Sequence, residues 1–175
     1  MPTPITHAFV AVALGRTAAG GRPPLRFWLL LAALGALPDL DTFTFALGIP
    51  YQSVWGHRGI THSLLFALVV SFVAAWLTHG TFSAFFKTRW RLWAVLFGIM
   101  AAHPLADAMT NGGLGVAFFA PIDNTRYFLP WRPIQVSPIG IRRFLTHRGL
   151  RVAISEALCV WLPVSALVIN MGAIP

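Results

Sequence analysis

The sequence predicts an all-α protein, a polytopic membrane bundle with about four to five membrane-embedded helices. Of its 175 residues, 57% are hydrophobic and only 10% are charged, whereas a soluble domain carries about 25% charged residues. Water therefore cannot solvate the whole surface. The apolar residues also form long runs separated by basic or Pro/Gly-rich links, which is the pattern of membrane helices. The length suits one domain, so residues 1–175 are expected to form a single membrane-embedded unit.

Five apolar segments are expected to be helical. They run from about Ile5 to Ala18, Leu25 to Leu37 with a short continuation from Phe43 to Leu47, His62 to Leu77, Leu92 to Ala108, and Val152 to Met171. Thr3 and Pro4 suit the cap and first turn of the first helix. We expect Pro38 to end the second helix, Gly80 the third, and Pro163 to kink the fifth. A crossing needs about 20 residues, so the first two segments are expected to be tilted, partly inserted or buried in the bundle.

The chain order predicts that one side of the bundle collects most of the ionisable residues. If successive helices cross in alternate directions, seven residues meet at one membrane face: His7, Asp39, Asp41, His57, His62, His103 and Asp107. The basic links that contain Arg22, Arg26 and Lys87 fall on the other face. Because unpaired charges are costly to bury, and ionisable residues within membranes are usually functional, this clustering indicates a site.

Imidazole and carboxylate together are the ligands of Zn²⁺, with Mn²⁺ as the alternative where oxygen ligands dominate. His103 and Asp107 are four residues apart, so they share one face of a helix. The predicted metal ligands are His7, Asp39, His62, His103 and Asp107. Asp41 and His57 either complete a second metal site, orient the ligands or serve as general base. One or two divalent ions are therefore expected.

Arginines near this cluster suggest a phosphorylated substrate. Arg58, Arg126, Arg142 and Arg143 are candidates to clamp phosphate oxygens. The net charge is +8, but the arginines lie between apolar runs. This favours membrane lipids and a lipid-like or phosphorylated small molecule as partners, and argues against nucleic acid. We therefore expect a membrane-bound metal-dependent hydrolase whose metal-activated water cleaves a phosphate ester of a lipid or polyprenyl-type substrate. Its predicted catalytic residues are Asp41, His57, Arg58 and Arg126.

Two other functions fit the same residues. The cluster suits a metal transporter or sensor, although a transporter needs ligands near the bilayer midplane and access from both faces. An intramembrane peptidase or esterase is the second enzymatic alternative, but the sequence contains no HExxH motif.

Several strings resemble a known family. They are Thr6-His7, Pro38-Asp39-Leu40-Asp41, His57-Arg58-Gly59-Ile60-Thr61-His62-Ser63, His103-Pro104-Leu105-Ala106-Asp107, Arg126-Tyr127-Phe128-Leu129-Pro130 and Ser137-Pro138. They resemble the bacterial inner-membrane metal-dependent hydrolases of the YdjM/YbcI type, over most of residues 1–145. The resemblance implies a multi-pass protein of the bacterial inner membrane and a metal-dependent hydrolase activity. A more distant similarity is to the all-helical zinc phospholipase C and P1-nuclease group, which cleaves phosphate esters, but this chain lacks that group's N-terminal Trp ligand.

The basic residues are nearly balanced between the two faces. The predicted ligand side holds Arg58, Arg126, Arg132, Arg142, Arg143, Arg148 and Arg151, and the other side holds Arg16, Arg22, Arg26, Lys87, Arg89 and Arg91. Basic loops favour the cytoplasm. Once the arginines that contact substrate are discounted, we expect the site to face the periplasm.

Overall fold

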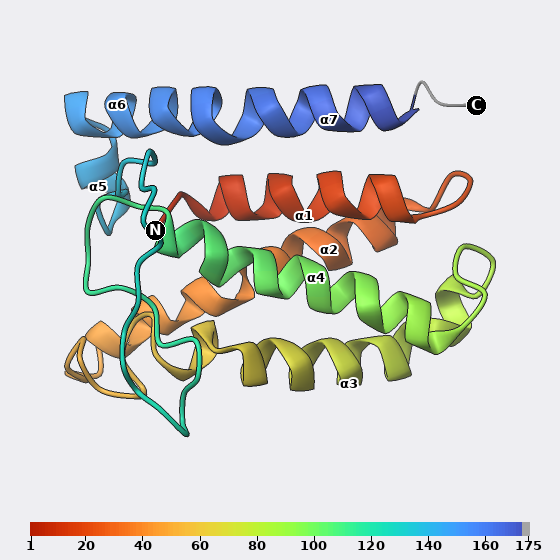
Figure 1. Ribbon diagram of the computed structural model, residues 1–175, viewed down its shortest axis with the longest axis horizontal. Helices are drawn as coiled ribbons and strands as arrows, with labels where there is room; N and C mark the ends of the chain where they lie inside the picture. The colour runs from red at the N-terminus through yellow and green to blue at the C-terminus, as the bar shows by residue number, and fades with distance from the viewer. Residues whose placement is uncertain (173–175) are drawn as a thin grey trace.

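The computed structural model describes residues 1–172, which form a bundle of helices joined by loops (Figure 1). The elements are α1 (Pro4–Ala18), α2 (Leu25–Ala36), η1 (Leu37–Phe45), η2 (Ile60–His62), α3 (Leu64–Phe82), α4 (Arg89–Ala108), α5 (Ile141–Phe144), α6 (His147–Glu156), η3 (Ala157–Trp161) and α7 (Leu162–Gly172). Across residues 1–172 the chain forms no β-strand, and two isolated β-bridges join its loops. The predicted all-α class is confirmed.

Three helical stretches are long and apolar enough to cross a membrane: Leu25–Phe45, Leu64–Phe82 and His147–Asn170. This is fewer than the four to five membrane-embedded helices expected. Helix α1 has 15 residues, which is shorter than the minimum of about 17 for a crossing. Helix α4 has 20 residues, but charged residues near both of its ends lower its hydropathy. The chain is a helical membrane protein in which α1 and α4 pack among more apolar helices.

Two prolines change the local helix type. Helix α2 ends at Ala36, within one residue of the predicted end before Pro38, but the chain continues directly as the 3₁₀ helix η1. Proline cannot donate the i→i−4 hydrogen bond, and the tighter 3₁₀ turn accommodates it. Before Pro163 the helix widens into the π-turn η3. This turn lies directly before Pro163, where the sequence predicted a change in the helix.

The third helix begins later than predicted. His62 belongs to the short 3₁₀ turn η2, and α3 begins at Leu64. The reason is local, because the Ser63 hydroxyl accepts the backbone N–H of Phe66 at 3.0 Å and so caps the helix. Helix α3 also continues past Gly80 to Phe82. His62 is therefore held in a turn at the end of the bundle.

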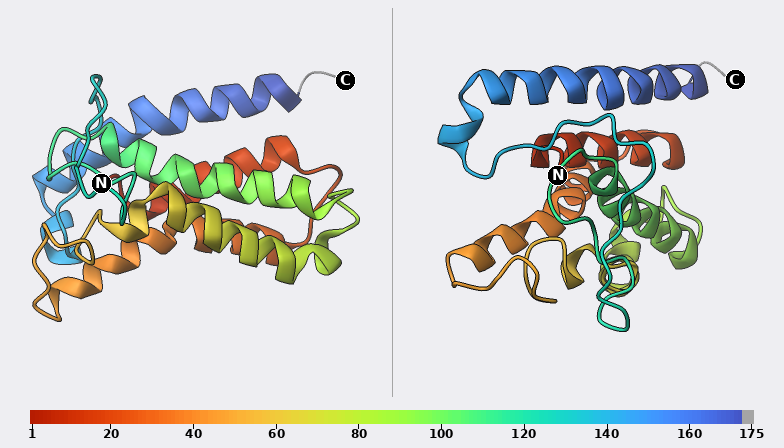
Figure 2. Two further views of the ribbon diagram at one scale, coloured as in Figure 1. Left: turned by 60° about the horizontal axis from the view of Figure 1, so that its bottom comes forward. Right: turned by 60° about the vertical axis from the view of Figure 1, so that its left-hand side comes forward.

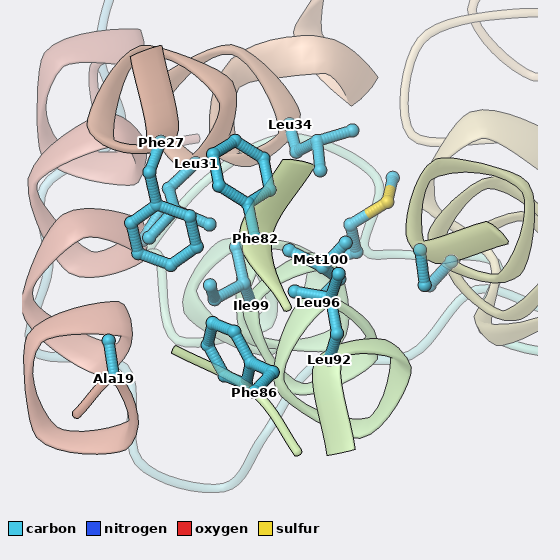
Figure 3. Packing of buried hydrophobic residues seen from close by; sticks show 13 residues of the cluster. Ala19, Phe27, Leu31, Leu34, Phe82, Phe86, Leu92, Leu96, Ile99 and Met100 are labelled. Carbon is cyan, nitrogen blue, oxygen red and sulfur yellow. The ribbon is translucent and has the colours of Figure 1, made fainter. Parts of the chain in front are cut away.

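A hydrophobic core fills the space between α1, α2, α3 and α4 (Figure 3). Phe27, Leu31, Phe82, Leu92 and Leu96 are buried there. Helix α3 packs along α4, and α1 packs along α2 and α4. Burial of each large apolar side chain contributes about 1.5–3 kcal/mol in water, and close packing against neighbours holds the helices together within a bilayer. This core holds the ends of α1, α2 and α4 in a defined relative position.

The last helices and the loops have distinct places. The rod formed by α6, η3 and α7 lies beside α1 (Figure 2), and α7 packs against α1. The N-terminus, η1 and the long loop after α4 lie at one end of the bundle, whereas the α1–α2 and α3–α4 links lie at the other (Figure 1). The helices therefore run in alternate directions as the sequence predicted.

Gly35 allows α1 and α2 to approach closely. A Cβ atom at Gly35 would lie 2.6 Å from Ala11 Cβ and 2.8 Å from the His7 carbonyl oxygen. We expect Gly35→Ala to destabilise the protein by about 1–3 kcal/mol, because the helices must separate. Gly80→Ala is the matched control, since a Cβ there meets nothing within 4 Å. Denaturant unfolding in detergent would measure both, and equal stability of the two variants would contradict this account of the crossing.

Candidate metal centre

Five side chains from separate elements meet at the loop-rich end of the bundle. Their relative exposures are 3% for His7, 5% for Asp39, 0% for His62, 2% for His103 and 0% for Asp107. His7 comes from the first turns of α1, Asp39 from η1, His62 from η2, and the other two from the last turns of α4. These are the five residues that the sequence singled out as ligands. The fold brings all of them to one point.

The inward atoms lie close together. His62 Nε2 lies 3.1 Å from His103 Nε2, 3.2 Å from Asp107 Oδ2 and 3.7 Å from Asp39 Oδ1. His103 Nε2 lies 3.4 Å from Asp39 Oδ1, and His7 Nε2 lies 3.3 Å from Asp107 Oδ1. Tetrahedral ligands about 2.0–2.1 Å from a zinc ion are roughly 3.3–3.4 Å apart. The spacing of four of these residues, Asp39, His62, His103 and Asp107, therefore suits one metal ion. His7 Nε2 adjoins them, 3.3 Å from Asp107 Oδ1 and 3.9 Å from Asp39 Oδ2.

Hydrogen bonds on the outer side of two imidazoles set their orientation. His103 Nδ1 lies 2.7 Å from the Gly35 carbonyl oxygen, and His62 Nδ1 lies 3.0 Å from Asp41 Oδ2. Both partners accept hydrogen bonds, so in the neutral rings each Nδ1 carries the proton and each Nε2 presents a lone pair. The two lone pairs then face each other across 3.1 Å. Two facing lone pairs repel each other unless a cation lies between the rings. The hydrogen bonds at Nδ1 are the usual outer support of metal-bound histidines.

The centre has an excess of acceptors and of negative charge. Both carboxylate oxygens of Asp39 and of Asp107, together with His7 Nε2, are buried without a hydrogen-bond partner. Buried polar atoms are normally paired, so these unpaired acceptors indicate a ligand. Asp39, Asp41 and Asp107 are all buried at this end, and the Arg58 guanidinium contacts one of them, with Nε 3.0 Å from Asp107 Oδ2. Buried carboxylates without their own cationic partners favour a bound cation.

The negative charge of these carboxylates also changes the proton affinity of His62. Burial opposes a positive charge on His62, but its contacts with Asp107, Asp39 and Asp41 outweigh this effect and raise the pKa of His62 well above its usual value. The carboxylates therefore attract positive charge to this point. A divalent cation provides more of that charge than a proton does, and it binds the unprotonated ring.

Asp41 and His57 form a separate pair beside the centre. His57 Nδ1 lies 2.6 Å from Asp41 Oδ1, and Asp41 Oδ2 accepts from the Thr61 hydroxyl at 2.6 Å and from the Arg58 backbone N–H at 3.0 Å. With His62, these residues form a second group of possible ligands. A separation of 2.6 Å is a short hydrogen bond rather than the spacing of two atoms on one ion. Burial lowers the pKa of His57, and its bond to Asp41 acts in the opposite direction.

Arg58 lies between this pair and the centre. It is fully buried and adopts a left-handed backbone with φ 61°, which is uncommon outside glycine. Its Nε lies 3.0 Å from Asp107 Oδ2, and its terminal nitrogens donate to the Gly112 carbonyl and the Thr110 hydroxyl. The unusual backbone turns the guanidinium inward while its N–H reaches Asp41.

The other arginines have different surroundings. Arg126 donates to the carbonyl oxygens of Tyr51 and His57 at 2.8 Å and 3.0 Å, and so holds together the loop that carries His57. Its catalytic role stays a prediction. Arg142 and Arg143 are exposed on α5. Arg126 is thus tied to the site through the loop, whereas the two α5 arginines lie at the surface.

Glu156 is a structural contributor to this end that the sequence did not identify. It is 1% exposed, and its carboxylate accepts from the Thr3 backbone N–H at 2.6 Å, the Thr3 hydroxyl at 2.7 Å and the Thr6 hydroxyl at 2.5 Å. It therefore anchors the first turn of α1 directly before His7. A lone carboxylate in an apolar helix was the available signal. No sequence pattern indicated that the Gly35 carbonyl oxygen would orient His103, because every residue has a backbone carbonyl.

Fold and site together define a polytopic helical membrane protein with a buried His/Asp cluster suited to a metal ion. The chain belongs to the family of YdjM inner membrane proteins, whose profile matches residues 1–174. The inner membrane protein YbcI of Escherichia coli (strain K12) is 39% identical over 163 residues, which cover 93% of this chain and 92% of that protein. No solved structure matches the chain. The resemblance seen in the motifs and the inner-membrane location are confirmed.

Proposed function

We propose that this chain is a metal-dependent hydrolase of the inner membrane that cleaves a phosphate ester of a lipid or polyprenyl-type substrate. The observation that carries the proposal is the convergence of five buried ligand residues beside a His–Asp pair. A single Zn²⁺ fits the mixed nitrogen and oxygen ligands, with Mn²⁺ as the alternative. When bound, such an ion lowers the pKa of a water and polarises a phosphoryl oxygen.

The neighbouring residues support the chemistry of hydrolysis. Asp41 holds the Nδ1 side of His57 at 2.6 Å, which leaves Nε2 to accept a proton from the attacking water. The water oxygen forms a bond to phosphorus, the bond from phosphorus to the lipid oxygen breaks, and a proton passes to the departing alcohol. The Arg58 guanidinium supplies positive charge beside this point. Substrate and water therefore supply all the atoms of the phosphate and the alcohol that are released.

A transport function fits these observations less well. The five ligands gather at one end of the bundle (Figure 1) and are at most 5% exposed. Alternating access requires a site that opens in turn to both faces. The position of the cluster therefore favours a hydrolase over a carrier.

A substrate screen tests the proposal. Metal-replete protein in detergent would be given phosphatidic acid, polyprenyl phosphates and a short soluble phosphate ester, with released phosphate as the readout. We expect release from a lipid phosphate by the wild type and none by Asp39→Asn. Cleavage of only a peptide or an acyl ester would overturn the phosphate assignment. Absence of any hydrolysis, with metal movement across liposomes, would overturn the enzyme assignment.

We expect the site to face the periplasm, because Arg58 is buried and Arg126 is bonded to loop carbonyls, which removes both from the basic surface at this end. In a Cys159→Ser background, a cysteine at Ile122 should react with an impermeant maleimide applied to the periplasmic side. A cysteine at Lys87 should react only after the membrane is opened. Both positions are exposed. Reaction of both cysteines from one side would contradict the topology, and the reverse pattern would invert the orientation.

A further inference from the structure

We infer that the substrate is a membrane lipid ending in a small phosphate headgroup, which enters sideways from the bilayer between the start of α1 and the segment 137–144. This inference rests on the proposed hydrolase function and specifies its substrate and its entry route. It is carried by two adjoining, mainly apolar cavities beside the metal centre, the smaller of which has His57 and Arg58 among its lining residues.

The smaller cavity lies against the centre. It has a volume of about 220 Å³, and Tyr51, His57, Arg58 and Gly113 contribute to its walls. Arg58 connects it to the metal ligands, because Arg58 Nε lies 3.0 Å from Asp107 Oδ2. Sites for drug-sized ligands occupy about 300–1,000 Å³. This cavity therefore suits a phosphate group and excludes a peptide or a large glycan headgroup.

Gly113 keeps this cavity open. Its φ is +92°, and a Cβ there would lie 2.8 Å from an Arg58 terminal nitrogen and 2.9 Å from the Tyr51 hydroxyl. Only the backbone of Gly113 fits against these groups. The guanidinium has five N–H donors: Nε lies 3.0 Å from Asp107 Oδ2, one terminal N–H donates to Gly112 and one to Thr110. Two N–H groups remain on the terminal nitrogens of this fully buried side chain, and charge-assisted bonds from arginine are the strong ones for phosphate.

The second cavity is mainly apolar and adjoins the first. It has a volume of about 390 Å³, with Ile5, Pro138, Ile139 and Phe144 in its walls. Met1, Ser137 and Ile139 line both cavities, so the two lie side by side. Ile5 is 67% exposed and Ile139 is 44% exposed. The second cavity therefore meets the outer surface of the bundle, where a lipid chain leads back into the bilayer.

Charge favours an anionic lipid. Neither cavity has a carboxylate among its lining residues, whereas Arg58 is among those of the smaller one. Arg142 and Arg143 lie on α5, which follows the segment that lines both cavities and sits at the same end as the N-terminus (Figure 1). An anionic headgroup is thus attracted to this entrance.

A different apolar groove serves as an internal comparison. Phe9, Val12 and Trp28 line it together with residues of α7, and its volume is about 420 Å³. It contains none of the predicted metal ligands and lies farther along α1 from His7. A lipid there is remote from the reaction. Labelling at this groove would therefore separate general lipid contact from substrate binding.

Photo-crosslinking tests the inference without requiring turnover. Full-length, zinc-loaded protein in nanodiscs would be exposed to phosphatidic acid with a diazirine near the carboxyl end of one acyl chain, and the labelled peptides mapped by mass spectrometry. We expect labelling of Ile5 and segment 137–144, lowered at least fivefold by Ile139→Trp, which fills the junction of the cavities. Ile122→Trp is the control, since Ile122 is 91% exposed and lines neither cavity. Zinc content and elution volume would verify that both variants fold.

Competition and turnover separate the possible outcomes. Unlabelled phosphatidic acid should compete, whereas inorganic phosphate and phosphatidylcholine with the same chains should not. Labelling confined to the α1–α7 groove, or equal competition by phosphatidylcholine or inorganic phosphate, would overturn the inference. Hydrolysis of a soluble ester without labelling of segment 137–144 would overturn it and leave the hydrolase intact. Specific labelling with no hydrolysis of any phosphate would support the lipid site and overturn the proposed function.

Discussion

We expect Asp107→Asn to lose bound metal almost completely. Asp107 is fully buried, and its two oxygens lie 3.3 Å and 3.2 Å from the inward nitrogens of His7 and His62 without a hydrogen-bond partner. The amide has the same shape but removes one negative charge and replaces one acceptor by a donor. Even residues that only support metal ligands change affinity by about 10–100-fold, so loss of a ligand should lower it by at least roughly 100-fold.

Elemental analysis of purified protein would measure this effect, with about one ion per wild-type chain as the expected reference. Asp123→Asn is the matched control, because Asp123 lies in the loop after α4 and its carboxylate accepts from Thr125 and Tyr127. Its metal content should equal that of the wild type. Wild-type metal content in Asp107→Asn, or a metal-free wild type after zinc addition, would refute the site.

We expect His57→Gln to lower turnover by about 10²–10⁴-fold, the usual contribution of a general base, while metal content stays at the wild-type level. Glutamine can still bond to Asp41, but it cannot accept the proton of the attacking water. His57 lies outside the group formed by Asp39, His62, His103 and Asp107, and its Nδ1 is bonded to Asp41. This variant therefore separates metal binding from catalysis.

Phosphate release from the substrate found in the screen would measure this effect. His147→Gln is the control, because His147 is an exposed histidine that begins α6 at the same end of the bundle. Asp41→Asn should reduce both turnover and metal affinity, since Asp41 contacts His57 and also His62 Nδ1. Wild-type turnover in His57→Gln would exclude His57 as the general base. A parallel loss of metal would instead identify His57 as a direct metal ligand.

The ligands were predictable because alternating helices carry defined residues to defined ends. His7 begins one helix, Asp39 follows another, and His103 lies near the end of a third, so helix direction alone brings them to one face. The spacing of His103 and Asp107 likewise follows from helix geometry. These inferences need only the order and approximate length of the apolar segments, which strong hydropathy patterns determine well.

The roles of individual residues were not predictable in this way. Sequence spacing left Asp41 as a ligand, a base or a support, because a carboxylate suits all three. The 2.6 Å contact with His57 and the 3.0 Å contact with His62 Nδ1 favour a supporting role. Likewise, Arg126 was predicted to clamp phosphate, whereas its observed partners are loop carbonyl oxygens.

The sequence by itself determined the helical membrane class, the family motifs and the end of the bundle at which the ligands gather, because these follow from apolar runs and chain direction. Only the tertiary structure decided that the 3₁₀ helix η1 carries the chain on through Pro38, that the Gly35 carbonyl orients His103, and that Glu156 anchors the turn before His7. The physical reason is that such contacts depend on main-chain atoms and on distances of a few tenths of an ångström between segments far apart in the chain. Those distances are set by how the helices pack, and helix packing cannot be read from a local sequence pattern.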